Sequence, residues 1–477
     1  MSHNTPTRRH FFIGPLLAGA VPAAGYGSAA SLKMLGYKSP NEKLNIAAIG
    51  AGGKGASDIA GCATENIVAL ADVDWARAER TFKLHEKAPK YKDFRQMLDK
   101  EGRNIDAVII ATPDHMHGIA TMAAMERGKG VYTQKPLTRT VWEARALTQA
   151  AAKFKVPSQM GNQGYSNEGT RQCAEMIWAG EIGAVTEVHA WTNRPVWPQG
   201  IAELPKEDAV PSTLDWDLWL GGSAQRPYAS AYLPFNWRGW LDFGSGSLGD
   251  MACHILGAPN MALQLGAPVA VECVKKAGNN KHTHPKSSVI RFDFPARGSM
   301  RAVKVFWYDG AVEPPFRPNG LGAEEVLGDL PRRPAVDPAK PAANASDRLN
   351  QNVNRAIQRG SNGSLFIGEK GLITTGTYGE NTRLLPAEKM KDYKMPPQFL
   401  TRSPGHYRDW IRACKGGGRA CSDFSIAGPF TEWIALGVLA TRFEGKLEWD
   451  SAKMRVTNNN AANEYLKPKF RKGWQMA

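Results

Sequence analysis

The sequence LNIAAIGAGGKGASDIAGCA, residues 44–63, joins a short apolar run to a glycine-rich turn and then to a helical pattern. An apolar run that stops at a glycine is typical of a buried parallel strand. Gly50, Gly52 and Gly55 give the spacing G-x-G-x-x-G at the end of that strand. There, the first glycine makes the turn, the second admits a pyrophosphate, and the third lets helix and strand pack closely. The stretch therefore predicts a dinucleotide-binding strand–turn–helix unit.

An acidic residue about 20 positions after the glycines completes this fingerprint. Asp72 ends the next predicted strand, where its carboxylate can accept hydrogen bonds from ribose hydroxyls and repel a 2′-phosphate. Gly53 and Lys54 open the following helix, whose N-terminus supplies free N–H groups, so we include them in the cofactor site. We expect NAD as the cofactor, and NADP stays open because Arg77 and Arg80 lie near Asp72.

Strands and helices alternate along the first third of the chain. Further apolar runs and helical stretches follow in turn at residues 105–112, 118–127, 130–136, 140–154 and 156–163. Alternation of this length predicts a doubly wound parallel sheet with helices on both faces. We therefore expect an α/β protein whose NAD(P)-binding Rossmann domain spans residues 43–163.

The pattern changes after residue 163. Runs of alternating apolar and polar residues, such as VAVECVKKA, SSVIRFDFP and MRAVKVFWYDG, follow one another with no helix between them. Such strands predict a large open sheet that is mostly antiparallel. We expect a second α/β domain over residues 164–477, with a Pro-rich surface loop near residues 313–344.

The N-terminal residues carry a different signal. Arg8-Arg9 precedes a weakly apolar stretch rich in Gly and Ala, a pattern typical of a twin-arginine export signal. We expect the signal at residues 1–30 and a linker at 31–42. The twin-arginine export machinery would then deliver the folded protein, with periplasm as the destination. The alternative is a disordered basic tail.

Length and composition exclude several classes of protein. The chain has 477 residues, which is too long for one ordinary core and suggests two domains. Its net charge of +15 comes from scattered Lys and Arg without a basic run, so we expect no nucleic-acid partner. No stretch after the signal is apolar for long enough to span a membrane. Six cysteines are too few for a disulfide scaffold, although a Cys414–Cys421 pair stays open.

The stretch GDMACHIL places Asp250 four residues before His254, among small and apolar neighbours. On a helix, residues i and i+4 share a face, so a carboxylate and a base can act on one atom. The two groups could instead hydrogen-bond each other or hold a metal. We expect no metal, because His189, His282 and His284 have no spacing that recruits them as further ligands.

Two other predicted strands of the first domain end in polar residues. Thr112-Pro113 and then His117 follow one strand, and Lys135 ends the other, directly before Pro136. The carboxyl ends of parallel strands meet at the edge where open α/β sheets bind ligands. We therefore expect Thr112, Pro113, His117 and Lys135 to contact the cofactor.

These motifs together resemble the glucose–fructose oxidoreductase / inositol dehydrogenase (Gfo/Idh/MocA) family. The residues that carry the resemblance are Gln134-Lys135-Pro136, Trp237-Arg238, and the D-x-x-x-H pair Asp250 and His254. The family's first marker is E-K-P, so an amide stands here in place of an acid. The resemblance covers nearly all of the chain past residue 43. Two of its stretches, LDWDLWLG at residues 214–221 and GPFTEWIALG at residues 428–437, look like a long, bacterial, often exported branch of the family.

The resemblance implies an NAD(P)-dependent oxidoreductase that acts on a hydroxyl of a sugar, polyol or glycoside. It implies Lys135, Asp250 and His254 as catalytic residues, with Lys135 across the nicotinamide from the other two. His254 would take the hydroxyl proton, Lys135 would stabilise the alkoxide, and Asp250 would orient the imidazole or grip a hydroxyl. Trp237 and Arg238 would join the cofactor site.

The second domain would then bind the carbohydrate and form a homodimer or homotetramer. Asn162 and Gln163, which follow the last Rossmann strand, are expected to contact the substrate together with Asp250 and His254. Two other functions stay open. One is an NAD-dependent glycoside hydrolase or lyase that works through a transient 3-keto sugar, and the other is a non-catalytic sugar- or cofactor-binding protein.

Overall fold

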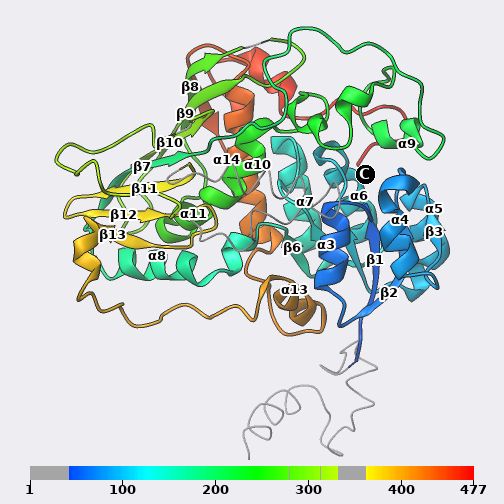
Figure 1. Cartoon of the computed structure of the whole chain (residues 1–477), viewed down its shortest axis with the longest axis horizontal. Helices are drawn as coiled ribbons and strands as arrows, with labels where there is room; N and C mark the ends of the chain where they lie inside the picture. Colours follow the sequence, from blue (N-terminus) through cyan, green and yellow to red (C-terminus); the bar gives the residue numbers. More distant parts are fainter. Residues whose placement is uncertain (1–41, 279, 312, 331–360, 477) are drawn as a thin grey trace, which may run out of the picture.

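The computed structural model describes residues 42–278, 280–311, 313–330 and 361–476. They form two sheets with helices between and around them (Figure 1). The predicted signal at residues 1–30, all but the last residue of the predicted linker, and residues 331–344 of the Pro-rich segment lie outside the described residues.

The first sheet has six parallel strands in the order β3-β2-β1-β4-β5-β6. The strands are β1 (Asn45–Ile49), β2 (Asn66–Ala71), β3 (Lys90–Tyr91), β4 (Ala107–Ile110), β5 (Gly130–Thr133) and β6 (Ser158–Met160). The helices that follow them are α3 (Lys54–Gly61), α4 (Trp75–Leu84), α5 (Phe94–Glu101), α6 (Asp114–Glu126) and α7 (Val141–Phe154). This strand order is that of doubly wound nucleotide-binding domains, so the predicted Rossmann fold is confirmed. Strands are added on one side of β1 up to β3 and on the other side from β4 onward, and ligands bind at the carboxyl ends of the strands beside such a switch point.

The second sheet has nine strands in the order β13-β12-β11-β7-β10-β9-β8-β14-β15. They are β7 (Val185–Trp191), β8 (Ala270–Ala277), β9 (Ser287–Phe294), β10 (Val303–Asp309), β11 (Gly363–Gly368), β12 (Leu372–Thr375), β13 (Arg383–Leu385), β14 (Lys446–Asp450) and β15 (Arg455–Val456). Only β7 and β10 pair in parallel, so the prediction of a mostly antiparallel sheet is confirmed. Buried and half-buried residues alternate along β9, as expected for a strand with one face on the core. The helices of this part are α8 (Glu168–Trp178), α9 (Trp216–Leu220), α10 (Gly246–Ile255), α11 (Gly257–Leu263), α13 (His406–Cys414) and α14 (Phe424–Ala440).

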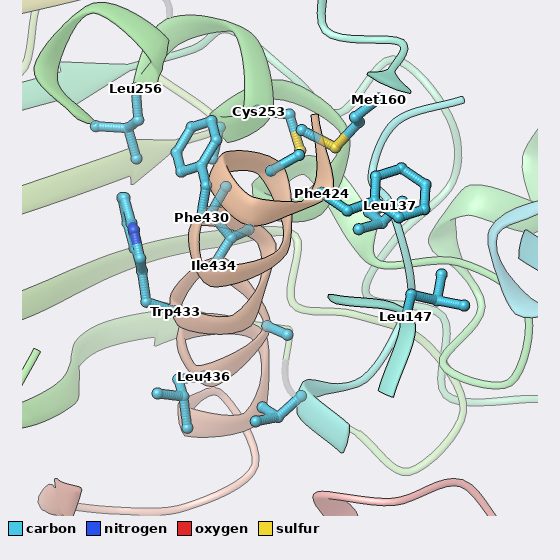
Figure 2. Close-up of a cluster of buried hydrophobic side chains, with 14 of the residues drawn as sticks. Leu137, Leu147, Met160, Cys253, Leu256, Phe424, Phe430, Trp433, Ile434 and Leu436 are labelled. Atoms are coloured by element: carbon cyan, nitrogen blue, oxygen red, sulfur yellow. The ribbon is translucent and has the colours of Figure 1, made fainter. Parts of the chain in front are cut away.

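Helix α14 joins the two halves of the molecule because it is apolar on nearly every side. It lies between the two sheets and contacts α7 and β6 of the first domain as well as β8 and β9 of the second (Figure 1). Figure 2 shows Phe424 near Leu137 and Met160, and Trp433 on another side of the same helix, beneath Leu256. One continuous core therefore fixes the two domains against each other.

Helix α13 also crosses the sequence boundary between the domains. Its residues Trp410 and Ile411 pack with Leu44 and Ile46 in a core on one face of the first sheet. The Rossmann domain is thus completed by a helix from near the end of the chain. None of the described helices is both long and apolar enough to cross a membrane.

Candidate active site

A cavity of about 350 Å³ opens at the carboxyl edge of the first sheet. Its walls come from the glycine turn after β1, the ends of β2, β4 and β5, and segments of the second domain near α10. Twelve of the residues predicted for the site line it, namely Gly50, Gly52, Lys54, Asp72, Thr112, Pro113, His117, Lys135, Gln163, Trp237, Arg238 and His254. Motifs that lie far apart in the sequence therefore meet around one space.

The glycine turn has the backbone geometry that a pyrophosphate site requires. Gly50 has φ +86°, and a Cβ there would lie 2.6 Å from the Ala111 oxygen. A Cβ on Gly55 would lie 1.9 Å from the Gly50 oxygen, so only glycine lets α3 pack this closely. Gly53 is the N-cap of α3 and supplies no side-chain cap, which leaves the helix start available for an anion. Gly53 and Gly55 shape the turn from outside the cavity wall.

Asp72 holds the turn as well as facing the cavity. Its Oδ2 accepts hydrogen bonds from the backbone N–H groups of Ala51 (2.8 Å) and Gly52 (3.0 Å). Across the same cavity, Thr112 has a buried Oγ1 with no hydrogen-bond partner among the described residues. A buried hydroxyl of this kind is costly unless a ligand completes it. The glycine turn, Asp72 and Thr112 therefore fit a bound dinucleotide.

Lys135 and Asp250 form an ion pair at the junction of the two domains. Lys135 Nζ lies 2.9 Å from Asp250 Oδ1 and donates a second hydrogen bond to the Asp250 backbone oxygen at 3.0 Å. Arg238 Nε donates to the same Oδ1 at 3.2 Å. Burial acts to raise the pKa of Asp250, but the charges of Lys135 and Arg238 hold it well below its usual range. Asp250 is therefore a carboxylate that fixes two cations.

This pairing changes the role expected for Asp250. Asp250 and His254 both lie on α10, as predicted. The Asp250 carboxylate, however, accepts hydrogen bonds from Lys135 and Arg238 rather than from the imidazole. Lys135 and Arg238 line the cavity, whereas Asp250, which binds both, does not. Lys135 and Asp250 consequently lie side by side, whereas the resemblance implies that they face each other across the nicotinamide.

His254 lines the cavity as a buried, neutral imidazole. Burial, and next the positive charge of Lys135, lower its pKa well below the ordinary value of 6.5. Its Nδ1 is buried without a hydrogen-bond partner among the residues that the structure describes. The edge of its ring packs against Tyr378, with the two ring centroids 4.7 Å apart. A neutral imidazole with an unused nitrogen can accept a proton from a ligand.

The low pKa of His254 predicts a pH dependence of stability. Below pH 6.5 the unfolded chain protonates this histidine and the folded chain does not, so the free energy of unfolding falls as pH falls. We expect the loss of stability between pH 6.5 and pH 5 to be smaller in His254→Gln than in the wild type, by roughly 1–2 kcal/mol. Urea unfolding at the two pH values measures this difference. Equal losses in the two proteins would show that His254 is protonated in the folded state.

Gln134, which replaces the acid of the E-K-P marker, has a carboxylate partner from another helix. Its Nε2 donates to Asp58 Oδ2 at 2.8 Å, and its Oε1 accepts the backbone N–H of Lys135 at 3.2 Å. Asp58 lies on α3, is fully buried, and also accepts hydrogen bonds from Tyr407 Oη (2.7 Å) and Lys54 Nζ. A glutamate at position 134 would set two buried carboxylates side by side, which is unfavourable. The amide therefore suits its surroundings.

Asp114 and Tyr378 are cavity residues that sequence reasoning missed. Asp114 begins α6, and its Oδ2 accepts hydrogen bonds from the backbone N–H (3.1 Å) and Oγ (2.9 Å) of Ser245, just before α10. Burial raises the pKa of Asp114 to about 7. Its place directly after Thr112-Pro113 was a usable signal. Tyr378 comes from a turn after β12, and nothing in the local sequence marks it.

Two residues predicted to contact ligands have partners within the protein. Asn162 is fully buried and outside the cavity wall, and its Oδ1 accepts a hydrogen bond from Ser422. Its Nδ2 has no hydrogen-bond partner among the described residues, and its contact with substrate stays a prediction. His117 lines the cavity, but its Nδ1 and Nε2 lie 2.7 and 2.8 Å from the backbone oxygens of Pro136 and Thr112. Its imidazole therefore bridges the segments that follow β4 and β5.

All six cysteines are free thiols, including Cys414 and Cys421.

Comparison with known proteins agrees with this architecture. Residues 44–162 match the NAD-binding Rossmann fold of the Gfo/Idh/MocA oxidoreductase family, and residues 178–289 match the family's C-terminal alpha/beta domain. The chain is 29% identical over 179 residues to an inositol 2-dehydrogenase of Rhodococcus erythropolis, which covers 36% of this chain and 51% of that protein. The chain thus spans about half the length of this curated relative.

Two solved structures share the fold. Levoglucosan dehydrogenase in complex with NADH and levoglucosan superposes with a TM-score of 0.53 at 16% identity, over 85% of this chain and 99% of that chain. The WlbA dehydrogenase of Bordetella pertussis, in complex with NADH and UDP-GlcNAcA, gives 0.54 at 13% identity, over 86% and 99%. The two matched segments hold the glycine turn, Asp72, Lys135 and the helix with Asp250 and His254, and over these segments the chain belongs to the Gfo/Idh/MocA oxidoreductase family with an NAD-binding Rossmann domain.

Proposed function

We propose that the protein is an NAD-dependent oxidoreductase that moves a hydride between a carbinol carbon of a carbohydrate and nicotinamide. One observation carries the proposal. The cavity that holds the dinucleotide fingerprint also holds a lysine fixed by a carboxylate and a buried neutral histidine. Oxidation of an alcohol needs these two groups, one to stabilise developing negative charge on oxygen and one to take its proton.

The nicotinamide would supply the hydride acceptor, and the residues of this chain would do the rest. Lys135, held by Asp250, presents its ammonium group to the substrate oxygen and stabilises it as an alkoxide. His254 accepts the hydroxyl proton while the carbon gives up its hydride, so charge is balanced on the substrate. Asp250 acts through Lys135 and Arg238 as a positioning residue.

The cavity walls support a carbohydrate as the substrate class. Trp219, Trp237 and Tyr378 line the cavity together with the amide of Gln163. Aromatic faces beside polar groups suit the apolar and hydroxyl-bearing sides of a sugar or polyol ring. The similar proteins include an inositol dehydrogenase and a levoglucosan dehydrogenase, whose substrates fall within this class. A panel of inositols, anhydrosugars, free sugars and glycosides with added NAD tests the proposal, with NADH formation as the signal.

Asp72 should set the preference for NAD over NADP. In Asp72→Ser the acceptor for the ribose hydroxyls is lost, the repulsion of a 2′-phosphate ends, and Arg77 remains in the cavity wall beside the site. We expect the ratio of NADP to NAD affinity to rise about tenfold or more. Because both nucleotides share the pyrophosphate, loosening of the turn held by Asp72 changes both affinities and leaves their ratio unaffected. An unchanged ratio would remove Asp72 from the ribose site.

We also propose that the protein is exported to the periplasm by the twin-arginine route and acts there as a homodimer or homotetramer. The Arg8-Arg9 pattern and the family resemblance support this. A protein that folds around its nucleotide before export would retain it, and would reoxidise it in place with a second substrate or later in the same cycle. Purified protein should then turn over without added NAD, either in sugar–sugar oxidoreduction or in oxidation-assisted glycoside cleavage. Strict dependence on added NAD with stoichiometric NADH release would contradict this closed cycle.

A further inference from the structure

A second cavity, of about 310 Å³, lies between the start of α7, the end of α14 and the C-terminal segment near residues 464–469. Its walls share no residue with those of the first cavity. The charged residues that line it are Arg139, Asp242, Arg442, Glu464, Lys467 and Lys469. Four cations thus line this partly open cavity together with two carboxylates, and the proposed reaction uses none of them.

The two arginines of this second cavity have carboxylates nearby but form no ion pair with any residue that the structure describes. Burial raises the pKa of Glu143, and the charge of Arg139 acts to lower it. Burial lowers the pKa of Arg442, and the charge of Asp242 acts to raise it. Asp242 is already paired with Arg226, which lies outside the cavity wall. Arg139 donates from Nη1 to the Leu241 backbone oxygen at 2.8 Å, but its Nε is buried with no hydrogen-bond partner among those residues. A buried guanidinium N–H without an acceptor is costly, which indicates a missing ligand oxygen.

The positive charges of Arg139 and Arg442 also repel each other. Burial, and next the charge of Arg139, lower the pKa of Arg442. Like charges that share a cavity repel unless an anion lies between them. The cavity also includes Thr140 and Val141 at the start of α7, where a capping box between Thr140 and Glu143 already completes the helix end, so the arginines are the groups left to bind an anion.

We propose that this second cavity binds a small molecule bearing a carboxylate or phosphate group, held between Arg139 and Arg442. Guanidinium groups bind both kinds of oxyanion through paired N–H donors. The apolar wall formed by Leu241, Val438 and Leu439 would hold the carbon skeleton of an organic anion. Arg139 follows Lys135 by four residues and donates a hydrogen bond to the backbone oxygen of Leu241, which precedes α10. The ligand would therefore contact the segment after Lys135 and the segment before α10, both of which lead into the active site.

Titration calorimetry tests the proposal with two probes, inorganic phosphate and citrate, each compared with sodium chloride at equal ionic strength. The protein is first saturated with NADH, which blocks the glycine turn, so that the measured heat does not include binding of a probe there. We expect saturable binding of at least one probe to the wild type. Binding should be about tenfold or more weaker in Arg442→Gln and lost in the double variant Arg139→Gln/Arg442→Gln. Lys446→Gln, which removes an exposed charge outside the cavity, should bind like the wild type.

A second measurement does not depend on the variants folding. Crystals of the wild-type protein soaked in tungstate should show anomalous density between the guanidinium groups of Arg139 and Arg442. Phosphate binding without citrate binding would assign a phosphate-bearing ligand, and the reverse would assign a carboxylate. The proposal is overturned if neither probe binds above the chloride control, or if binding persists unchanged in the double variant.

Discussion

Replacing Lys135 by methionine is expected to lower kcat for carbohydrate oxidation by ~10² or more, because the alkoxide loses its stabilising charge. The substitution keeps the length and apolar stem of the side chain. Asp250 retains Arg238 as a partner at 3.2 Å, so the carboxylate is not left unpaired and the fold should survive. Steady-state kinetics with the best substrate of the panel, together with NADH affinity, measure the effect.

The affinity for NADH should change little in Lys135→Met, since the glycine turn and Asp72 lie elsewhere in the cavity. Lys446→Met is the matched control, because Lys446 is exposed on β14 and distant in sequence from every residue that lines the first cavity. It should retain wild-type turnover. Turnover near that of the wild type in folded Lys135→Met would end the catalytic assignment of Lys135.

Replacing His254 by alanine is expected to lower kcat by a similar factor, ~10² or more, because the hydroxyl proton loses its acceptor. NADH binding should persist, since His254 belongs to α10 of the second domain and the nucleotide fingerprint to the first. The variant His254→Gln distinguishes the role of His254 as proton acceptor from its role in packing the cavity wall. Glutamine restores a polar side chain beside Tyr378 but cannot take the proton, so it should be as inactive as alanine. Recovery of turnover in His254→Gln would show that His254 serves only to shape the cavity.

The sequence predicted the parts of the site that depend on local rules. The Gly50 turn, Asp72 after β2 and Lys135 after β5 follow from strand ends and backbone geometry, and parallel topology brings them to one edge. The pairing of Asp250 with Lys135 could not be predicted in this way. It joins residues 115 positions apart across the domain junction, and only packing around α14 sets their distance.

The same reason explains what sequence reasoning missed in the rest of the structure. Tyr378 reaches His254 from a turn far along the chain, and α13 completes the core of the first domain from residues 406–414. Asn162 follows β6 at the predicted edge of the sheet, and its hydrogen bond with Ser422, 260 residues further along the chain, could not be predicted locally. Contacts that close long loops are set by the global fold and leave no local periodicity to recognise.

Transfer of deuterium from substrate to nucleotide tests the central claim most directly. The protein is incubated with NAD and a carbohydrate from the panel that is deuterated at its carbinol carbons, and the nucleotide is then extracted and its mass measured. The reaction is stopped within the first turnover, before a closed cycle can return the deuteride to carbon, so hydride transfer is detected whether the nucleotide is released or stays bound. The account predicts deuterium in the reduced nicotinamide for the wild type and almost none for Lys135→Met or His254→Ala. Absence of deuterium with every member of the panel, in protein shown to bind NAD, would contradict it.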